Sequence, residues 1–192
     1  MTDPSRDAAP PAARPDTDAD ADADIDTDTA RLVAWGQELR SVHARLRDAL
    51  EVAREAVDSA GDAAPAPSDG ADPRRLLGLY WHGFCQALEG HHRGEDATVF
   101  TALLDLRPDL AGVVAELQRD HRLLDHLLGE LARAVDAGAD AAALDRHLDG
   151  IDAVMETHFR YEEKRLIAVL DEPALAVALA GTDRRAALGP LA

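Results

Sequence analysis

The feature that most limits how this chain can fold is a series of apolar residues that recur every three or four positions. Between residues 108 and 137 the steps alternate without a slip, and one member is a histidine: Leu110, Val114, Leu117, His121, Leu124, Leu128, Leu131 and Val135. Side chains at these steps share one face of an α-helix. The stretch therefore predicts an amphipathic helix whose buried face contains an imidazole.

Three further segments, 31–59, 72–104 and 141–170, show the same stepping. Breaks rich in glycine and proline, or short turns, separate them at 60–73, 104–108 and 138–140. Aromatic residues make up only 4% of the chain, whereas strands favour aromatic and β-branched side chains. The sequence thus predicts an all-α fold, an up-and-down antiparallel four-helix bundle.

The two ends of the chain differ from this pattern. Residues 1–28 are rich in aspartate and have almost nothing to bury, so they are predicted to form a disordered acidic tail. The bundle is expected to span 29–172. Residues 173–192 are expected to be a C-terminal tail with at most one short helix, near 174–180.

Net charge and cysteine content indicate the cellular compartment and the partners of the chain. A formal net charge of -17 without a basic patch argues against nucleic acid and anionic membranes as partners. No apolar run reaches the roughly 18 residues of a membrane span. A lone cysteine, Cys85, and no apolar leader after Met1 predict a reduced, cytoplasmic protein.

Polar residues interrupt the apolar face of every predicted helix. These residues lie at similar depths in their helices: His43, His91, Glu95, His121, His158 and Glu162. A buried polar group without a partner costs about 1–3 kcal/mol, so each needs a hydrogen bond or a metal ion. Their convergence from four helices predicts a shared site in the core.

The spacing of a histidine and an acid four residues later is weak evidence by itself. Five of the eight histidines have it, and on an exposed helix face it is an ordinary side-chain pair. His126 and His147 lie off the apolar faces and are interpreted as surface residues. His82 lies opposite Glu95 and is interpreted as a surface residue or as an outer partner of a ligand. Cys85 is interpreted as a small buried hydrophobic residue.

Together with His92, which follows His91, the set comprises five imidazoles and two carboxylates. Such mixed nitrogen and oxygen ligands suit iron, manganese or zinc better than magnesium or calcium. If Glu95 and Glu162 bridge two six-coordinate ions that share an oxide or hydroxide, about eleven of about twelve positions are filled. The remaining position suits a small ligand such as O₂, peroxide or nitric oxide.

These residues resemble the hemerythrin-like (HHE cation-binding) domain family, a four-helix bundle with a non-haem di-iron site. The resemblance covers about residues 31–170 and rests on His43, the stretch from Phe84 to Asp96, Asp120–His121, and His158 to Glu163. It implies two iron ions with a bridging oxide or hydroxide. It also implies ligand roles for His43, His91, Glu95, His121, His158 and Glu162, with Glu95 and Glu162 as bridges.

Two positions depart from the oxygen-carrying members of that family. They have a second histidine in the third helix, where this chain has Asp125. They also have an aspartate five residues after the last histidine, where this chain has Glu162 at four residues and Glu163 at five. The chain is thus more similar to the bacterial hemerythrin-like branch. Either His92 or Asp125 is expected to complete the ligands of the second ion; if neither does, that ion has an additional open position and is more reactive.

Three functions follow as expectations. The first is a di-iron protein that binds O₂, nitric oxide or peroxide for sensing, carriage, scavenging or iron handling. The second is a peroxidase or catalase-like enzyme, with Tyr161 and Asp125 as the nearest proton donors. The third is a structural bundle whose inward histidines are hydrogen-bonded core residues.

Overall fold

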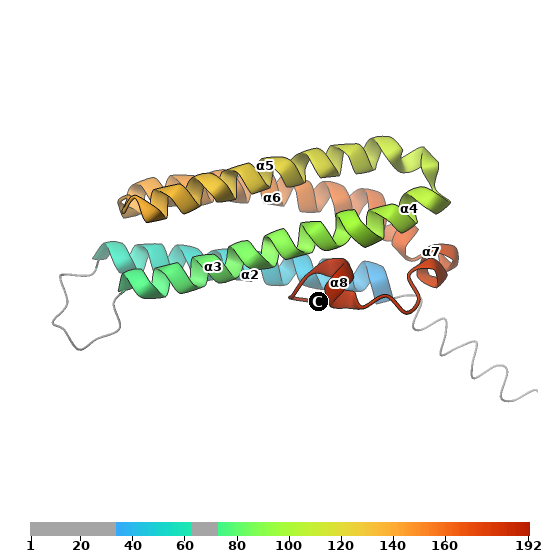
Figure 1. The fold of residues 1–192 in the computed structure, drawn as a ribbon, viewed down its shortest axis with the longest axis horizontal. Coiled ribbons are helices and arrows are strands. Elements are labelled where there is room, and N and C mark those ends of the chain that lie inside the picture. The colour runs from blue at the N-terminus through green and yellow to red at the C-terminus, as the bar shows by residue number, and fades with distance from the viewer. Residues whose placement is uncertain (1–33, 63–72) are drawn as a thin grey trace, which may run out of the picture.

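The computed structural model of the chain describes residues 34–62 and 73–192. Throughout these ranges the regular structure is helical and no strand is present. The four longest helices lie side by side as a bundle (Figure 1): α2 (Ala34–Asp62), α3 (Pro73–Gly94), α5 (Ala111–Asp136) and α6 (Ala141–Leu170). The predicted all-helical class is confirmed, whereas the predicted acidic tail lies outside the described residues.

The core lies between the long helices, where the predicted apolar faces meet. α2 packs against α3 and α6, and α5 packs against α6. On α5 the predicted stripe is buried from Val114 to Leu131, and only Val135, near the end of the helix, is half-buried. The alternating steps of four and three therefore identified the inward face of this helix correctly.

The second predicted segment is not one continuous α-helix. α3 leads into a π-helix, η1 (Glu95–Val99), and then into α4 (Phe100–Leu106). A π-turn holds more residues than an α-turn, so it shifts the side chains that follow it. Thr98, three residues after Glu95, is only half-buried, whereas Val99 and Phe100 are buried.

Short turns join the later helices. A 3-10 turn, η2 (Pro108–Leu110), precedes α5, and Gly138 in the turn before α6 has a φ of 70°, which favours glycine. The side chain of Asp140 accepts a hydrogen bond from the backbone N–H of Ala143 and caps α6. α6 begins and ends where the sequence predicted.

The C-terminal residues form two short helices, where the sequence suggested one. These are α7 (Pro173–Ala178) and α8 (Arg184–Leu188). α8 packs against α3 and η1, and Figure 1 shows it lying beside α3. The end of the chain is therefore part of the packed structure.

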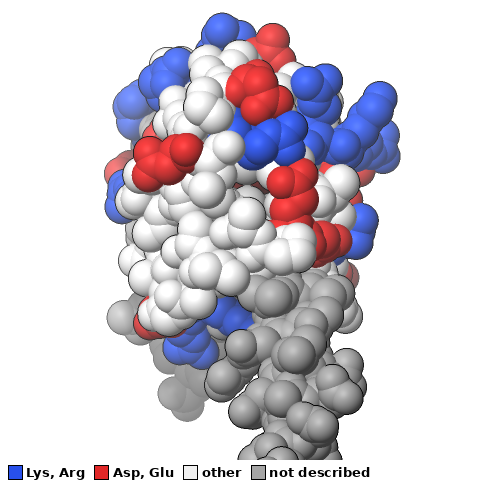
Figure 2. Space-filling model, turned by 90° about the vertical axis from the view of Figure 1, so that its right-hand side faces the viewer, with Lys and Arg blue, Asp and Glu red and all other residues white. Residues whose placement is uncertain are grey.

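The end of the bundle that carries α4 and α7 is viewed in Figure 2. Uncharged side chains occupy much of its centre, and charged side chains of both signs lie around them. Leu106 on α4 and Val177 on α7 are among the exposed large apolar residues. Within residues 34–62 and 73–192, no helix has both the length and the apolar character needed to cross a membrane.

Two neighbouring leucines on α5 test this assignment of the core. Leu124 is fully buried, whereas Leu123 is 44% exposed. Leu124→Ala is expected to lower the free energy of unfolding by about 2–5 kcal/mol, because it removes buried apolar surface and leaves a cavity. Leu123→Ala should change it by about 0.5 kcal/mol or less. Denaturant unfolding of the metal-free protein measures both, and equal losses would contradict the assignment.

Candidate metal centre

The structure brings all seven candidate ligands together in the interior. They come from α2, α3, η1, α5 and α6 and are at most 2% exposed: His43, His91, His92, Glu95, His121, His158 and Glu162. Side chains three or four residues apart share a helix face, so each of these polar residues points into the bundle with the apolar residues of its own helix.

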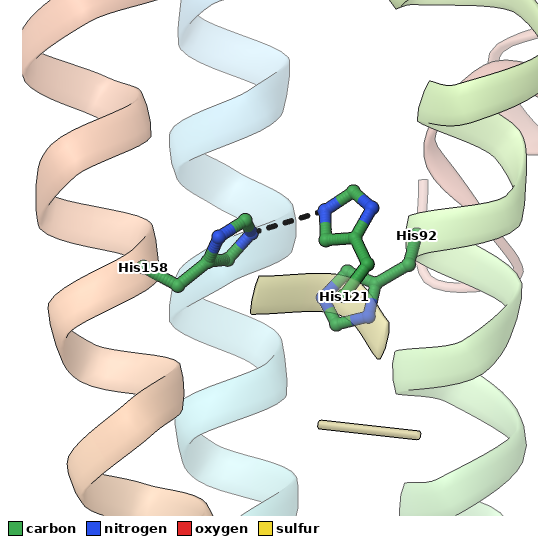
Figure 3. Close-up of side chains that lie close together, drawn as sticks. All are labelled: His92, His121 and His158. Atoms are coloured by element: carbon green, nitrogen blue, oxygen red, sulfur yellow. Dashed lines mark hydrogen bonds between the residues drawn. The ribbon is translucent and has the colours of Figure 1, made fainter. Parts of the chain in front are cut away.

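The seven residues fall into two groups. His92, His121 and His158 form one, shown in Figure 3, and His43, His91, Glu95 and Glu162 form the other. Within each group the candidate ligand atoms all lie within 4.8 Å of one another. Each group could hold a metal ion.

Glu95 spans the two groups. Its Oε1 lies 3.3 Å from Nε2 of His91, and its Oε2 lies 3.6 Å from Nε2 of His121. One oxygen of this carboxylate thus faces each group.

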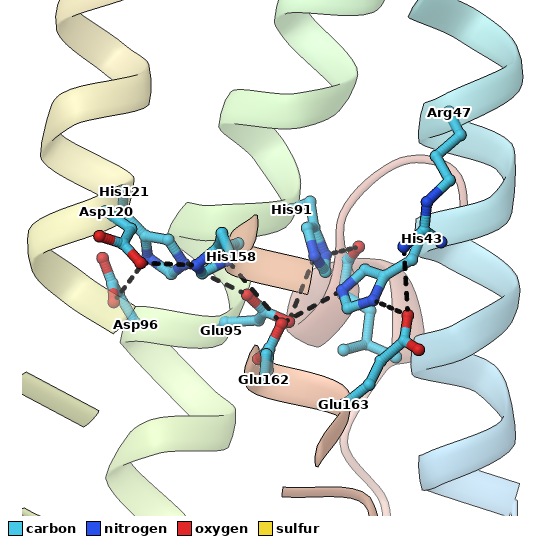
Figure 4. Close-up of polar contacts among 11 residues, drawn as sticks. His43, Arg47, His91, Glu95, Asp96, Asp120, His121, His158, Glu162 and Glu163 are labelled. Atoms are coloured by element: carbon cyan, nitrogen blue, oxygen red, sulfur yellow. Dashed lines mark hydrogen bonds and ion pairs between the residues drawn. The ribbon is translucent and has the colours of Figure 1, made fainter. Parts of the chain in front are cut away.

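Glu162 lies in a similar position through a single oxygen. Its Oε2 is 3.1 Å from Nε2 of His43 and 3.8 Å from Nε2 of His158. In Figure 4 both carboxylates lie between His121 and His158 on one side and His43 and His91 on the other. Both are therefore placed to be shared by two ions.

Outer carboxylates lie behind three of the imidazoles, and two of these carboxylates are within hydrogen-bond distance. Nδ1 of His43 lies 2.8 Å from Oε1 of Glu163, and Nδ1 of His121 lies 3.2 Å from Oδ1 of Asp96. Asp120 lies farther away, with its Oδ2 3.7 Å from Nδ1 of His158. With Nδ1–H facing a carboxylate, the lone pair of Nε2 points into the centre, which is the tautomer a metal ligand needs.

His91 has a different outer partner. Its Nδ1 donates to the backbone carbonyl of Leu188 at 3.0 Å, and both groups are buried. This contact also leaves Nε2 free on the inner side.

Many side-chain nitrogen and oxygen atoms that face the centre have no hydrogen-bond partner. Buried side-chain atoms without a hydrogen bond include Nε2 of His43 and His91, both ring nitrogens of His92, and both carboxylate oxygens of Glu95 and Glu162. Unpartnered carboxylates and imidazoles in the core are costly, and a bound cation removes that cost. The residues present therefore fit a metal centre.

The contact between His121 and His158 supports the same conclusion. Their Nε2 atoms lie 3.2 Å apart. His121 directs the lone pair of its Nε2 toward His158, because its Nδ1–H faces Asp96, whereas Nδ1 of His158 has no hydrogen-bond partner. A cation beside the two Nε2 atoms could coordinate both of them.

Burial sets the protonation of the imidazoles. It lowers the pKa of His91 and His92 well below the usual range and lowers the pKa of His158 to about 4. These rings are therefore neutral at neutral pH, the form that binds metal. Burial and the nearby charge of Glu162 raise the pKa of Glu95, as expected for a carboxylate that needs a cation beside it.

Residues outside the groups also bear on the sequence predictions. Of the two candidates for the remaining ligand, His92 lies in the three-histidine group, whereas Asp125 is exposed. His82 and His126 are exposed, His147 is half-buried, and Cys85 is buried, as predicted for a small hydrophobic residue. Burial raises the pKa of the Cys85 thiol, which keeps it protonated.

Sequence reasoning missed the outer partners of the histidines. Asp96, Asp120 and Glu163 each adjoin a candidate ligand in the chain, but in a sequence with 37 acidic residues such neighbours carry no signal. The Leu188 carbonyl is a backbone group, so no side chain could reveal its role.

The outer carboxylates give a testable expectation. Asp96→Asn keeps the shape of the side chain but removes the charge behind His121. It should weaken metal binding at the three-histidine group by about 10-fold, the lower end for loss of such an outer partner. Competition with a chelator of known affinity measures the change, with Asp105→Asn, exposed on α4, as the control. Equal affinities in both variants would contradict a role for Asp96.

Comparison with known proteins yields one match. The family model described as hemerythrin HHE cation binding domain matches residues 37–177. No curated protein and no solved structure matches the chain. The matched range contains all seven candidate ligands and ends before α8.

Proposed function

Because the chain belongs to the hemerythrin HHE cation-binding domain family, we propose that its buried histidines and glutamates hold a pair of iron ions. The observation that carries this proposal is the pair of ligand groups with Glu95 and Glu162 between them. Membership of the family implies metal binding in a helical fold. The unpartnered buried atoms of this chain supply the ligands for it.

In this proposal the residues divide between the ions by their groups. His43 and His91 hold one ion, and His92, His121 and His158 hold the other. Glu95 and Glu162 bridge them, together with one oxide or hydroxide. The ion beside His43 and His91 then receives one imidazole fewer, so we assign the open position to it.

We also propose that the bundle has the up-and-down antiparallel arrangement. The pairings of α2 with α3 and α6, and of α5 with α6, support it. So do the colours of Figure 1, in which neighbouring long helices run in opposite directions. In such a bundle each helix can contribute ligands at one shared height.

The surroundings of the centre favour a small ligand. When bound, an iron pair supplies a redox-active centre for O₂, nitric oxide or peroxide. The ring of Phe159 stacks on His43 with centroids 3.9 Å apart, and Phe100 stacks on His121 at 5.6 Å. Both rings are at most 1% exposed, so they place apolar surface directly beside the two ligand groups.

Binding is a better proposal than peroxidase or catalase-like turnover. Turnover requires proton donors at the centre, and the sequence offered Tyr161 and Asp125. The hydroxyl of Tyr161 donates to Glu116, away from both ligand groups, and Asp125 is exposed. Neither residue supports the enzymatic alternative.

Metal content and optical spectra test the proposal directly. The purified chain should hold close to two irons after anaerobic loading with Fe²⁺. Near-ultraviolet charge-transfer bands should bleach on reduction and return in air. Binding of nitric oxide, azide or peroxide should then shift these bands. A folded, helical protein that takes up no iron would refute the assignment.

A further inference from the structure

The last residues of the chain lie against the candidate centre. We define the C-terminal strap as residues 184–192, which comprise α8 and the residues after it. We propose that this strap positions His91 and holds the ion beside His43 and His91 against exchange. The inference rests on the proposed function, since it concerns the same centre.

The strap supplies the outer partner of one inner histidine. Nδ1–H of His91 donates to the carbonyl oxygen of Leu188 at 3.0 Å, and both residues are at most 1% exposed. No water can replace this acceptor while the strap is in place. The orientation of the His91 ring therefore depends on a contact between α3 and the far end of the chain.

Two glycines on α3 allow the strap to lie this close. A Cβ at Gly94 would be 2.7 Å from the carbonyl oxygens of Ala186 and Ala187, and one at Gly90 would be 2.8 Å from Cδ of Pro190. Contacts under 3.0 Å are not tolerated, so larger residues would displace the strap. Since Gly90 and Gly94 are four residues apart, they share one helix face and form a seat for it.

A third glycine faces them from the strap itself. Gly189 has a φ of 87°, and a Cβ there would lie 2.5 Å from the backbone nitrogen of His91. Ala187 and Leu188, just before it, are buried. Three glycines thus meet at the segment that carries His91 and His92.

The strap contact differs in charge from the other outer contacts. His43 and His121 face carboxylates, which strengthen an imidazole as a ligand, whereas the Leu188 carbonyl is neutral. The effect of the strap on His91 is therefore mainly to fix its tautomer and orientation. The family match ends at residue 177, so this contact is an addition to the matched domain.

The proposal predicts a selective effect on one ion. Without the Leu188 carbonyl the His91 ring can rotate, and the ion it shares with His43 loses a fixed ligand. The ion of the other three histidines is not affected, because none of those histidines contacts the Leu188 carbonyl and His121 keeps its contact with Asp96. A strap that only covers apolar surface would instead lower the stability of the whole bundle and affect both ions equally.

Full-length Gly94→Ala and Gly90→Ala chains test this directly. Each chain is loaded with Fe²⁺ without oxygen, and transfer of iron to an excess of a ferrous chelator is followed by absorbance. Gly94→Ala should release one iron per chain about 10- to 100-fold faster than the unaltered protein, and the second at an unchanged rate. Gly90→Ala should have a smaller effect in the same direction, because its Cβ would lie under 3.0 Å from only one atom, Cδ of Pro190.

Gly83→Ala is the matched control on the same helix, since a Cβ at Gly83 meets nothing within 4 Å. It should release both irons as the unaltered protein does. Thermal unfolding of the metal-free chains checks folding, and Gly90→Ala keeps the test valid if Gly94→Ala does not fold. Unchanged release in the glycine variants, or equal acceleration of both irons, would overturn the proposal. If the unaltered chain itself takes up no iron, the proposed function fails instead.

Discussion

Glu95→Gln should reduce iron loading from close to two ions per chain to one or fewer. Oε1 of Glu95 faces His91 and Oε2 faces His121, so this side chain alone presents one oxygen to each ligand group. The amide keeps a single oxygen and no charge, and it cannot bridge two cations. Metal analysis after anaerobic loading and removal of free iron measures the result.

The same substitution should make the metal-free protein more stable. Both oxygens of Glu95 are buried without a hydrogen bond, and burial raises the pKa of this carboxyl. A neutral amide removes the cost of burying or neutralising a carboxylate charge, so the free energy of unfolding of the metal-free chain should rise. Denaturant unfolding with a chelator present measures it.

Glu89→Gln provides the matched control on α3. Glu89 pairs with Arg93 at the surface, and such exposed pairs contribute little. Its substitution should leave iron content and stability unchanged. Glu95→Gln protein that still holds two irons per chain would show that Glu95 is not a bridge.

The sequence was most informative where a polar residue replaced an apolar one on a helix face. His121 and His158 occupy positions at which the four-and-three stepping requires burial, and the structure buries both. A buried imidazole needs a hydrogen bond or a metal ion, so these positions indicated a metal site as well as the inward face of each helix. The same reasoning separated Glu95 from the many acidic residues at the surface.

Periodicity could not predict the features that depend on neighbours in space. The π-helix at Glu95–Val99 interrupts the stepping, and nothing in the local sequence marks it. Asp96 and Glu163 directly follow Glu95 and Glu162, so they point about 100° away around the helix and resemble solvent-exposed acids. Their roles depend on His121 and His43, which lie on other helices.

The strap is a different case, because two glycines in the sequence indicate that another segment lies close to the helix. Gly90 and Gly94 flank His91 and His92 inside a predicted helix, where glycine is unfavourable. Such residues indicate a close approach of another backbone. The sequence alone could not show that the approaching segment is 184–192.

His92→Leu should give the second large effect, and it separates a metal ligand from a core histidine. Both ring nitrogens of His92 are buried without a partner, and the ring stacks on His121 with centroids 4.0 Å apart. Replacing it with leucine should raise the free energy of unfolding of the metal-free chain by about 1–3 kcal/mol, because no polar group remains to be satisfied. Iron content should fall to about one ion per chain, since His121 and His158 alone remain in that group.

The expected combination, a more stable metal-free chain that binds less iron, arises only if burial of His92 serves the metal. A hydrogen-bonded core histidine would lose stability on substitution, and a surface histidine would show neither change. His82→Leu, an exposed position on the same helix, should leave both quantities unchanged. If His92→Leu stabilised the chain yet still bound two irons, Asp125 or solvent would have to complete the second ion. The exposure of Asp125 argues against the first of these, and an open water position would then make that ion the more reactive of the two.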